Sequence, residues 1–209
     1  ANDFFYFIAD VAKGTDDLQI MYGVAGEKKL EEEILHHLHG YEGASPVRIG
    51  NGAYDQNQHD VWGAVLDSFY LHTKSRDGMP EEIWPILKRQ VHAAIEHWRE
   101  ADRGIWEVRG EPQHFTSSKV MCWVALDRGA RLARLREDHE LAAEWQMIAD
   151  EIHADICERA VDERGVFTQH YDTTALDASC LLLPLLRFLP ADDSRIRNTV
   201  LAIADELTD

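Results

Sequence analysis

The sequence predicts an all-α protein, and three observations lead to that class. Apolar residues recur at helical spacing along most of the 209 residues. No convincing run alternates polar and apolar side chains as a half-buried strand does. Hydrophobic residues make up 45% and charged residues 28% of the chain, a composition typical of a globular protein rather than a disordered one. We therefore expect one domain of packed helices over residues 1–209.

The first half of the chain predicts four helices. Apolar residues at helical spacing place the first three at about residues 1–12, 27–39 and 59–75. A fourth helix should begin at Pro80, because proline is favoured in a first helical turn and acidic residues follow it. Its apolar stripe runs from Ile83 to Trp98.

The second half predicts four more helices. One apolar stripe runs from Val120 to Leu135 and another from Leu141 to Ile156. A helix at about 174–189 would be apolar nearly all round and kinked at Pro184, and the last helix would cover about 193–207.

Two long linkers, residues 40–58 and 103–116, separate these helices. They carry Gly, Pro, Asn, Gln and aromatic residues, and loops of this length in compact domains are usually functional or disordered. The aromatic content favours function. Helix pairs with unequal linkers fit an αα-toroid, whose long loops form a pocket at one end, and they also fit an irregular bundle.

The charge and cysteine content limit the possible partners. The formal charge of -17 repels phosphate backbones and anionic lipids, which disfavours nucleic-acid and membrane-surface roles. No apolar run reaches the roughly 18 residues that span a bilayer. Three widely spaced cysteines, Cys122, Cys157 and Cys180, lie in apolar runs and predict reduced thiols in a cytoplasmic compartment.

The most informative segment is residues 102–129, DRGIWEVRGEPQHFTSSKVMCWVALDRG. Trp106 and Glu107 lie together on a loop bracketed by glycines, just before an amphipathic helix. An indole face stacks on sugar rings, and a partly desolvated carboxyl has the raised pKa that a general acid needs. Alternatively, Trp106 fills the core while Glu107 is solvated or paired with Arg109. Ser117 and Ser118 are expected to cap the following helix.

A second polar loop covers residues 40–63. It brings amides, carboxylates and aromatics together before a helix, and sugar hydroxyls need such partners because each one both donates and accepts hydrogen bonds. Tyr54, Gln58 and Asp60 are the candidates here. The alternative is a turn that caps the helix. His36, His37 and His39 are consecutive or nearly so and do not converge on one ion, so we expect no metal site.

Four segments together resemble glycoside hydrolase family 15, the glucoamylase, glucodextranase and trehalase group, in its bacterial form. They are LQIMYGVAGEKKLEE from Leu18, GYEGASPVRIGNGAYDQNQHDVWGAVLDS from Gly40, GIWEVRGEPQHFTSSKVMCWVALDRG from Gly104 and LDASCLLLPLLRFLP from Leu176. They follow the family's order over nearly the whole chain, and the GIWE segment is the most specific.

The resemblance implies an (α/α)6 barrel that hydrolyses α-glucosidic bonds from chain ends with inversion and without a cofactor. The substrate would be an α-glucan or an α-glucoside such as trehalose. Glu107 would be the general acid and Trp106 its stacking neighbour. Arg109, His114 and Lys119 are further pocket candidates, with the loop from Tyr54 to Asp60.

The chain departs from the family pattern in what it lacks. The family's glucose-gripping Arg-Asp pair would lie before Ala1 and its general base after Asp209, so we expect the middle half of a barrel. Such a piece would expose apolar faces at Phe4, Phe5 and residues 181–186, where it could self-associate. A non-catalytic α-helical module that binds carbohydrate or a protein partner is the alternative function.

Overall fold

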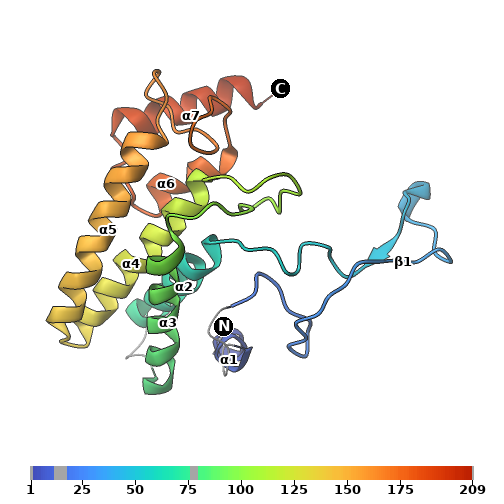
Figure 1. Ribbon diagram of the computed structural model, residues 1–209, viewed down its shortest axis with the longest axis horizontal. Coiled ribbons are helices and arrows are strands. Elements are labelled where there is room, and N and C mark those ends of the chain that lie inside the picture. Colours follow the sequence, from blue (N-terminus) through green and yellow to red (C-terminus); the bar gives the residue numbers. More distant parts are fainter. Residues whose placement is uncertain (1, 12–17, 76–79, 209) are drawn as a thin grey trace. The chain divides into compact units, whose positions relative to one another are not determined.

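The computed structural model describes residues 2–11, 18–75 and 80–208 (Figure 1). The chain divides into two compact units. Residues 19–57 form one unit, and residues 1–18 with 58–209 form the other. The second unit carries the helices and is called the helical unit below.

The described residues are mostly helical, which confirms the predicted all-α class. The longer helices are α1 (Asn2–Val11), α2 (Asp60–Ser75), α3 (Trp84–His97), α4 (Thr116–Leu135), α5 (His139–Arg159) and α7 (Ser194–Glu206). Shorter elements are α6 (Leu182–Leu185) and the 3-10 turns Tyr41–Gly43, Glu81–Ile83 and Ala178–Leu181. Among the described residues, every helix is too short or too polar to span a lipid bilayer.

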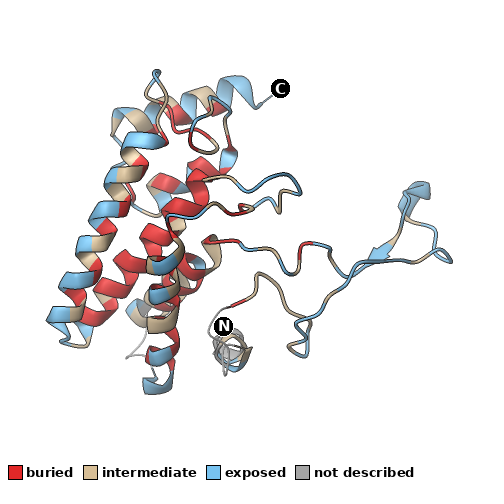
Figure 2. Ribbon diagram, viewed as in Figure 1, coloured by how far each residue is buried: buried red, intermediate tan, exposed pale blue. Residues whose placement is uncertain are grey.

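Helix α4 forms the centre of the helical unit, because α2, α3 and α5 all pack against it. Figure 2 shows buried residues along almost its whole length, and Leu126 near its middle is fully buried. Gly63 allows α2 to approach closely, since a Cβ atom there would lie 2.1 Å from the carbonyl oxygen of Met121. The apolar side chains that these helices remove from water provide the main stabilisation of the unit.

A buried ionic cluster joins three helices. The Arg128 guanidinium on α4 donates to Asp67 on α2 at 2.7 Å and to the neighbouring Asp127 at 2.5 Å. It also donates to the carbonyl oxygen of Leu186 at 2.9 Å, just after α6. Buried charges are tolerated only when they are paired and hydrogen-bonded, as they are here.

The helix predicted at 27–39 is wrong. The unit of residues 19–57 instead contains two short antiparallel strands, β1 (Glu33–Ile34) and β2 (Arg48–Ile49), with Glu33 opposite Ile49 and Ile34 opposite Arg48. Most of the segment is exposed. An isolated short helix is marginal in water without an apolar face buried against a partner, and this segment buries no such face.

The long helix predicted at 174–189 is also wrong. This segment is irregular up to residue 177 and then forms only a 3-10 turn and the single turn of α6. Pro184 has no N–H and cannot continue a regular helix. Of the predicted apolar face, Leu185 is 76% exposed whereas Leu183 is buried. The side chains of Phe4 and Phe5 lie outside the described residues.

Candidate functional site

The loop between α3 and α4 is closed at its base by its own backbone. Asp102 and Gln113 exchange two backbone hydrogen bonds, with N to O distances of 3.0 and 2.9 Å. Residues 103–112 therefore form a loop whose two ends are held together by this pair of hydrogen bonds. We call this segment, with Asp102 and Gln113, the acid loop.

A tight turn inside the acid loop sets the positions of Trp106 and Glu107. Gly104 has φ of 67°, and the backbone N–H of Glu107 donates to its carbonyl oxygen at 3.2 Å. A Cβ atom at Gly104 would lie 2.8 Å from the ring of Phe115, so glycine is required here both by conformation and by space. Glu107 itself has φ of 52°, which costs a non-glycine residue free energy and is often seen at functional sites.

The Trp106 side chain does not fill the core, so that interpretation of the sequence is wrong. It is 59% exposed. Its Nε1–H donates to both carboxylate oxygens of Asp177, at 3.0 Å to Oδ1 and 2.9 Å to Oδ2. Glu107 is half-buried and Arg109 is exposed on the same loop. The loop therefore holds an accessible indole and a carboxyl on neighbouring residues.

The side chain of Asp102 anchors the loop to the starts of two helices. Its Oδ2 accepts the backbone N–H of His59 at 2.9 Å, next to the start of α2, and the hydroxyl of Ser118 at 2.7 Å, in the first turn of α4. Helix α4 begins after Phe115 without a side-chain cap, so the predicted capping role of Ser117 and Ser118 is wrong. The Ser118 hydroxyl instead binds the carboxylate that closes the acid loop.

Two carboxyls lie at this anchor, the buried Asp102 and the half-buried Asp60. Burial and the nearby charge of Asp102 raise the pKa of Asp60 to about 6. Burial also raises the pKa of Asp102, although its hydrogen bonds from His59 and Ser118 and the charge of Lys119 act in the opposite direction. Asp60 is thus partly protonated near neutral pH, and its protonation depends on the charge of Asp102.

Lys119 and His114 line a hollow of about 390 Å³. The Lys119 ammonium is buried and donates to the backbone carbonyls of Trp98 and Glu100, just after α3, so it also has a structural role. The His114 ring stacks on Tyr171 with centroids 5.7 Å apart. Burial, and then the positive charge of Lys119, lower the pKa of His114, which favours a neutral imidazole.

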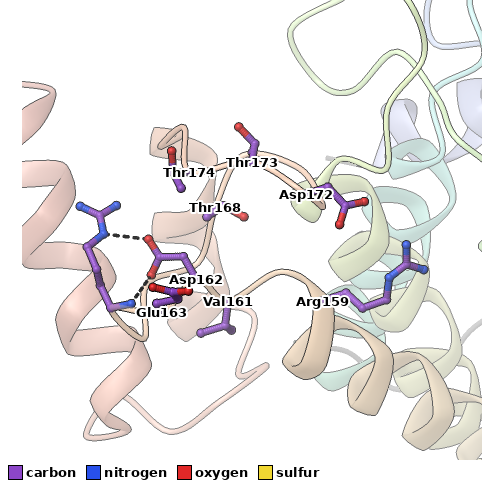
Figure 3. Close-up of a pocket in the computed structure, with 9 residues that line it drawn as sticks. Arg159, Val161, Asp162, Glu163, Thr168, Asp172, Thr173 and Thr174 are labelled. Carbon is purple, nitrogen blue, oxygen red and sulfur yellow. Dashed lines mark hydrogen bonds and ion pairs between the residues drawn. The ribbon is translucent and has the colours of Figure 1, made fainter.

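A second, more open hollow of about 920 Å³ lies beyond the end of α5. Figure 3 shows Asp162 on one side and Arg159 with Asp172 on the other. Asp162 accepts a hydrogen bond from the Arg164 guanidinium at 2.7 Å. Three threonines complete a largely polar wall. Trp106 and Glu107 line neither of the two hollows.

The structure brings only some of the predicted residues together. Trp106, Glu107 and Arg109 share the acid loop, and His114 and Lys119 share the smaller hollow. Gln58 and Asp60 lie at the start of α2, both within the helical unit, whereas Tyr54 belongs to the unit of residues 19–57.

Two residues of the site were missed by sequence reasoning. Neither Asp102, at the start of the segment 102–129, nor Asp177, in the LDAS segment, was predicted as a site residue. Both carboxyls are buried and bind groups far away in the sequence, 71 residues away in the case of Trp106 and Asp177. The only available signal was that each aspartate lies next to a recognisable motif. Among the residues that the structure describes, no group of three or more His, Cys, Asp or Glu side chains is arranged to hold a metal ion.

The chain as a whole is similar to several proteins named trehalase. The chain is 68% identical over its whole length to the trehalase of Mycobacterium tuberculosis and 64% identical to that of Mycolicibacterium smegmatis. A trehalase of Thermoplasma volcanium is 35% identical over 99% of the chain. The chain spans about a third of the length of these relatives, 31%, 32% and 33% respectively.

Solved structures show the same fold at low sequence identity. A glycosidase in complex with glucose matches 78% of this chain and 45% of its own, with a TM-score of 0.63 and 22% identity. The glucoamylase of Saccharomycopsis fibuligera matches 62% of this chain and 32% of its own, with a TM-score of 0.52 and 15% identity. The helices are thus part of an (α/α)6 toroid, as predicted.

The model of one protein family, described as glycosyl hydrolases family 15, matches residues 1–209. This match covers the whole chain and agrees with the relatives and with the fold. The chain therefore belongs to glycosyl hydrolase family 15.

Proposed function

We propose that this chain is part of a trehalase, an enzyme that hydrolyses the α-glucosidic bond of trehalose and releases glucose. The observation that carries the proposal is the 68% identity, over the entire chain, to a protein named trehalase. The acid loop supplies a chemical basis for it, because an exposed indole stands beside a carboxyl. Hydrolysis of short α-glucans is the related activity that the same site would support.

In the proposed mechanism Glu107 is the general acid. It protonates the glycosidic oxygen as the bond to the anomeric carbon breaks, and a second carboxylate activates a water on the opposite face of the sugar. That arrangement inverts the anomeric configuration and needs the two carboxyls roughly 6.5 to 9.5 Å apart. The Trp106 face supports the glucosyl ring by stacking.

We propose that the general base comes from a part of the protein outside these 209 residues. Asp177 is poorly suited to that role, because its two carboxylate oxygens already accept the Trp106 N–H and it is buried. Glu111 lies on the same loop as Glu107, only four positions further along. The glucose-gripping Arg-Asp pair would come from outside as well.

The test is glucose release by the full-length protein from trehalose and from a maltooligosaccharide. We expect trehalose to be the better substrate. Glu107→Gln should lower kcat by about a hundredfold or more, the usual contribution of a general acid. Glu111→Gln is the matched control, because it removes an exposed carboxyl from the same loop, and it should leave kcat unchanged.

Two results would contradict the proposal. Full activity of Glu107→Gln would remove Glu107 from the mechanism. Binding of trehalose by the full-length wild type without any glucose release would favour a carbohydrate-binding module instead.

We also propose a cytoplasmic location. The three cysteines are free thiols, two of them buried. Burial raises the pKa of the Cys180 thiol to about 12, which keeps it protonated and unreactive. Unpaired thiols are typical of proteins in reducing compartments.

A further inference from the structure

The hydrogen bond between Trp106 and Asp177 joins two side chains of opposite exposure. The indole is 59% exposed, whereas Asp177 is 5% exposed. The indole Nε1–H points between the two carboxylate oxygens, at 3.0 and 2.9 Å. A hydrogen bond to a carboxylate is stronger than one between neutral groups, and burial of the carboxylate strengthens it further.

Asp177 is itself held firmly. Its Oδ1 accepts the backbone N–H of Ser179 at 2.7 Å, at the start of the 3-10 turn Ala178–Leu181. The side-chain amide of Gln169 approaches its Oδ2 at 3.5 Å. The Asp177 carboxylate therefore has a fixed orientation, and its hydrogen bonds from the indole N–H fix the direction of the Trp106 ring.

The segment that bears Asp177 is also tied to the end of the acid loop. The backbone N–H of Tyr171 donates to the backbone carbonyl oxygen of His114 at 3.1 Å. The backbone N–H of Thr116 donates to the backbone carbonyl oxygen of Gln169 at 2.9 Å. These bonds keep residues 169–177 beside the start of α4. The Trp106 bond is the contact in this set that reaches a side chain of the proposed sugar site.

We propose that Asp177 is the positioning residue for Trp106: it orients the exposed indole as a flat platform for the glucosyl ring. This inference rests on the proposed function. An exposed tryptophan has several rotamers, and fixing one of them before the substrate arrives lowers the entropic cost of binding. Asp177 then acts on the sugar only through the indole, and not as an acid or base.

A double-mutant cycle on the full-length protein tests this role. Asp177→Asn keeps the shape and one acceptor oxygen but loses the charge, and Trp106→Phe keeps an aromatic face but loses the N–H. We expect Asp177→Asn to raise the KM for trehalose about fivefold with kcat within about twofold, because stacking contributes to substrate binding. In the Trp106→Phe background, Asp177→Asn should change KM by less than about 1.5-fold.

Direct binding supplies a readout that is independent of turnover. In the Glu107→Gln background, calorimetry should show trehalose binding weakened about fivefold by Asp177→Asn and by no more than about 1.5-fold once Trp106→Phe is present. Asp193→Asn is the matched control, since Asp193 also accepts a backbone N–H, from Arg195, at the start of a helix. It should leave KM and binding unchanged.

The outcomes separate the two proposals. If Asp177→Asn changes KM and trehalose binding equally in the presence of Trp106 and in the Trp106→Phe background, Asp177 acts on the fold or on the substrate directly. That result would overturn this inference alone. An unchanged KM in Asp177→Asn would do the same. A wild-type protein that neither binds nor hydrolyses trehalose or α-glucans would overturn both.

Discussion

The acid loop and the unit of residues 19–57 both carry many polar residues, but they are held in place in different ways. The acid loop is closed at Asp102 and Gln113 and anchored by a buried carboxylate. The unit of residues 19–57 is held by a two-residue ladder and by exposed contacts such as the ion pair between Arg48 and Glu32 at 3.2 Å. Exposed ion pairs of this kind contribute little to stability.

This difference shows that composition does not decide whether a loop is ordered for chemistry. The acid loop gains its fixed geometry from residues outside its own tip, above all Asp102 and Asp177. Residues 19–57 are mostly exposed. A catalytic carboxyl needs the first kind of support, because misplacement by about 1 Å is costly to the rate.

The largest expected effect is on the free energy of unfolding, and it compares a side chain of the helical unit with one in residues 19–57. Leu126→Ala removes a fully buried side chain from α4 and should lower the free energy of unfolding by about 2 to 5 kcal/mol. Ile34→Ala removes a side chain that is 42% exposed in β1 and should cost less than about 0.5 kcal/mol. Urea unfolding measures both, and equal losses would contradict the contrast.

A second effect concerns the anchor of the acid loop and depends on pH. The pKa of Asp60 is 3.8 in an unfolded chain and about 6 in the fold, so the folded state binds more protons between those values. Stability should therefore fall as the pH rises from about 4 to about 6. Asp60→Asn removes this loss and should raise the free energy of unfolding at pH 7.5 by up to about 3 kcal/mol.

The measurement is urea unfolding of wild type and Asp60→Asn at pH 4, 6 and 7.5. The variant should retain a weaker pH dependence of the same sign, because the pKa of Asp102 is also raised. Destabilisation of the variant at pH 7.5 would show that Asp60 is ionised and favourably bound in the fold.

The smallest effect tests the turn inside the acid loop. Gly104→Ala forces a Cβ against the Phe115 ring at a positive φ and should cost about 1 to 2 kcal/mol, with a clear fall in kcat. Gly110→Ala on the same loop would place its Cβ 3.6 Å from Val108, an ordinary contact, and should change neither quantity. Similar effects of the two variants would show that the turn does not set the site.

Sequence patterns predicted the parts of the fold that bury an apolar stripe. The stripes from Ile83, Val120 and Leu141 all correspond to helices, α3, α4 and α5, because each one packs against neighbours. The same spacing at 27–39 predicted a helix that is not there. Periodicity shows which face of a helix could be buried, but not whether another element is present to pack against it. At 174–189 the sequence predicted only a kink at Pro184, whereas the structure has no more than the single turn of α6 there.

The sequence also predicted Trp106 and Glu107 as a pair on one loop, because adjacent residues share a location whatever the fold. Their supports, Asp102 and Asp177, are distant in sequence from the groups that they bind. No periodic signal marks a buried aspartate, which is recognisable only by its hydrogen-bond partners in three dimensions.

The buried ammonium of Lys119 has a consequence for the point at which the chain leaves α3. It donates hydrogen bonds to the carbonyl oxygens of Trp98 and Glu100, which follow the end of α3 and would otherwise need another donor such as water. The end of α3 is thus specified by a side chain about twenty positions further along the chain. Arg99, which lies between these two carbonyls in the sequence, is tied instead to α5 by its ion pair with Glu151 at 2.5 Å.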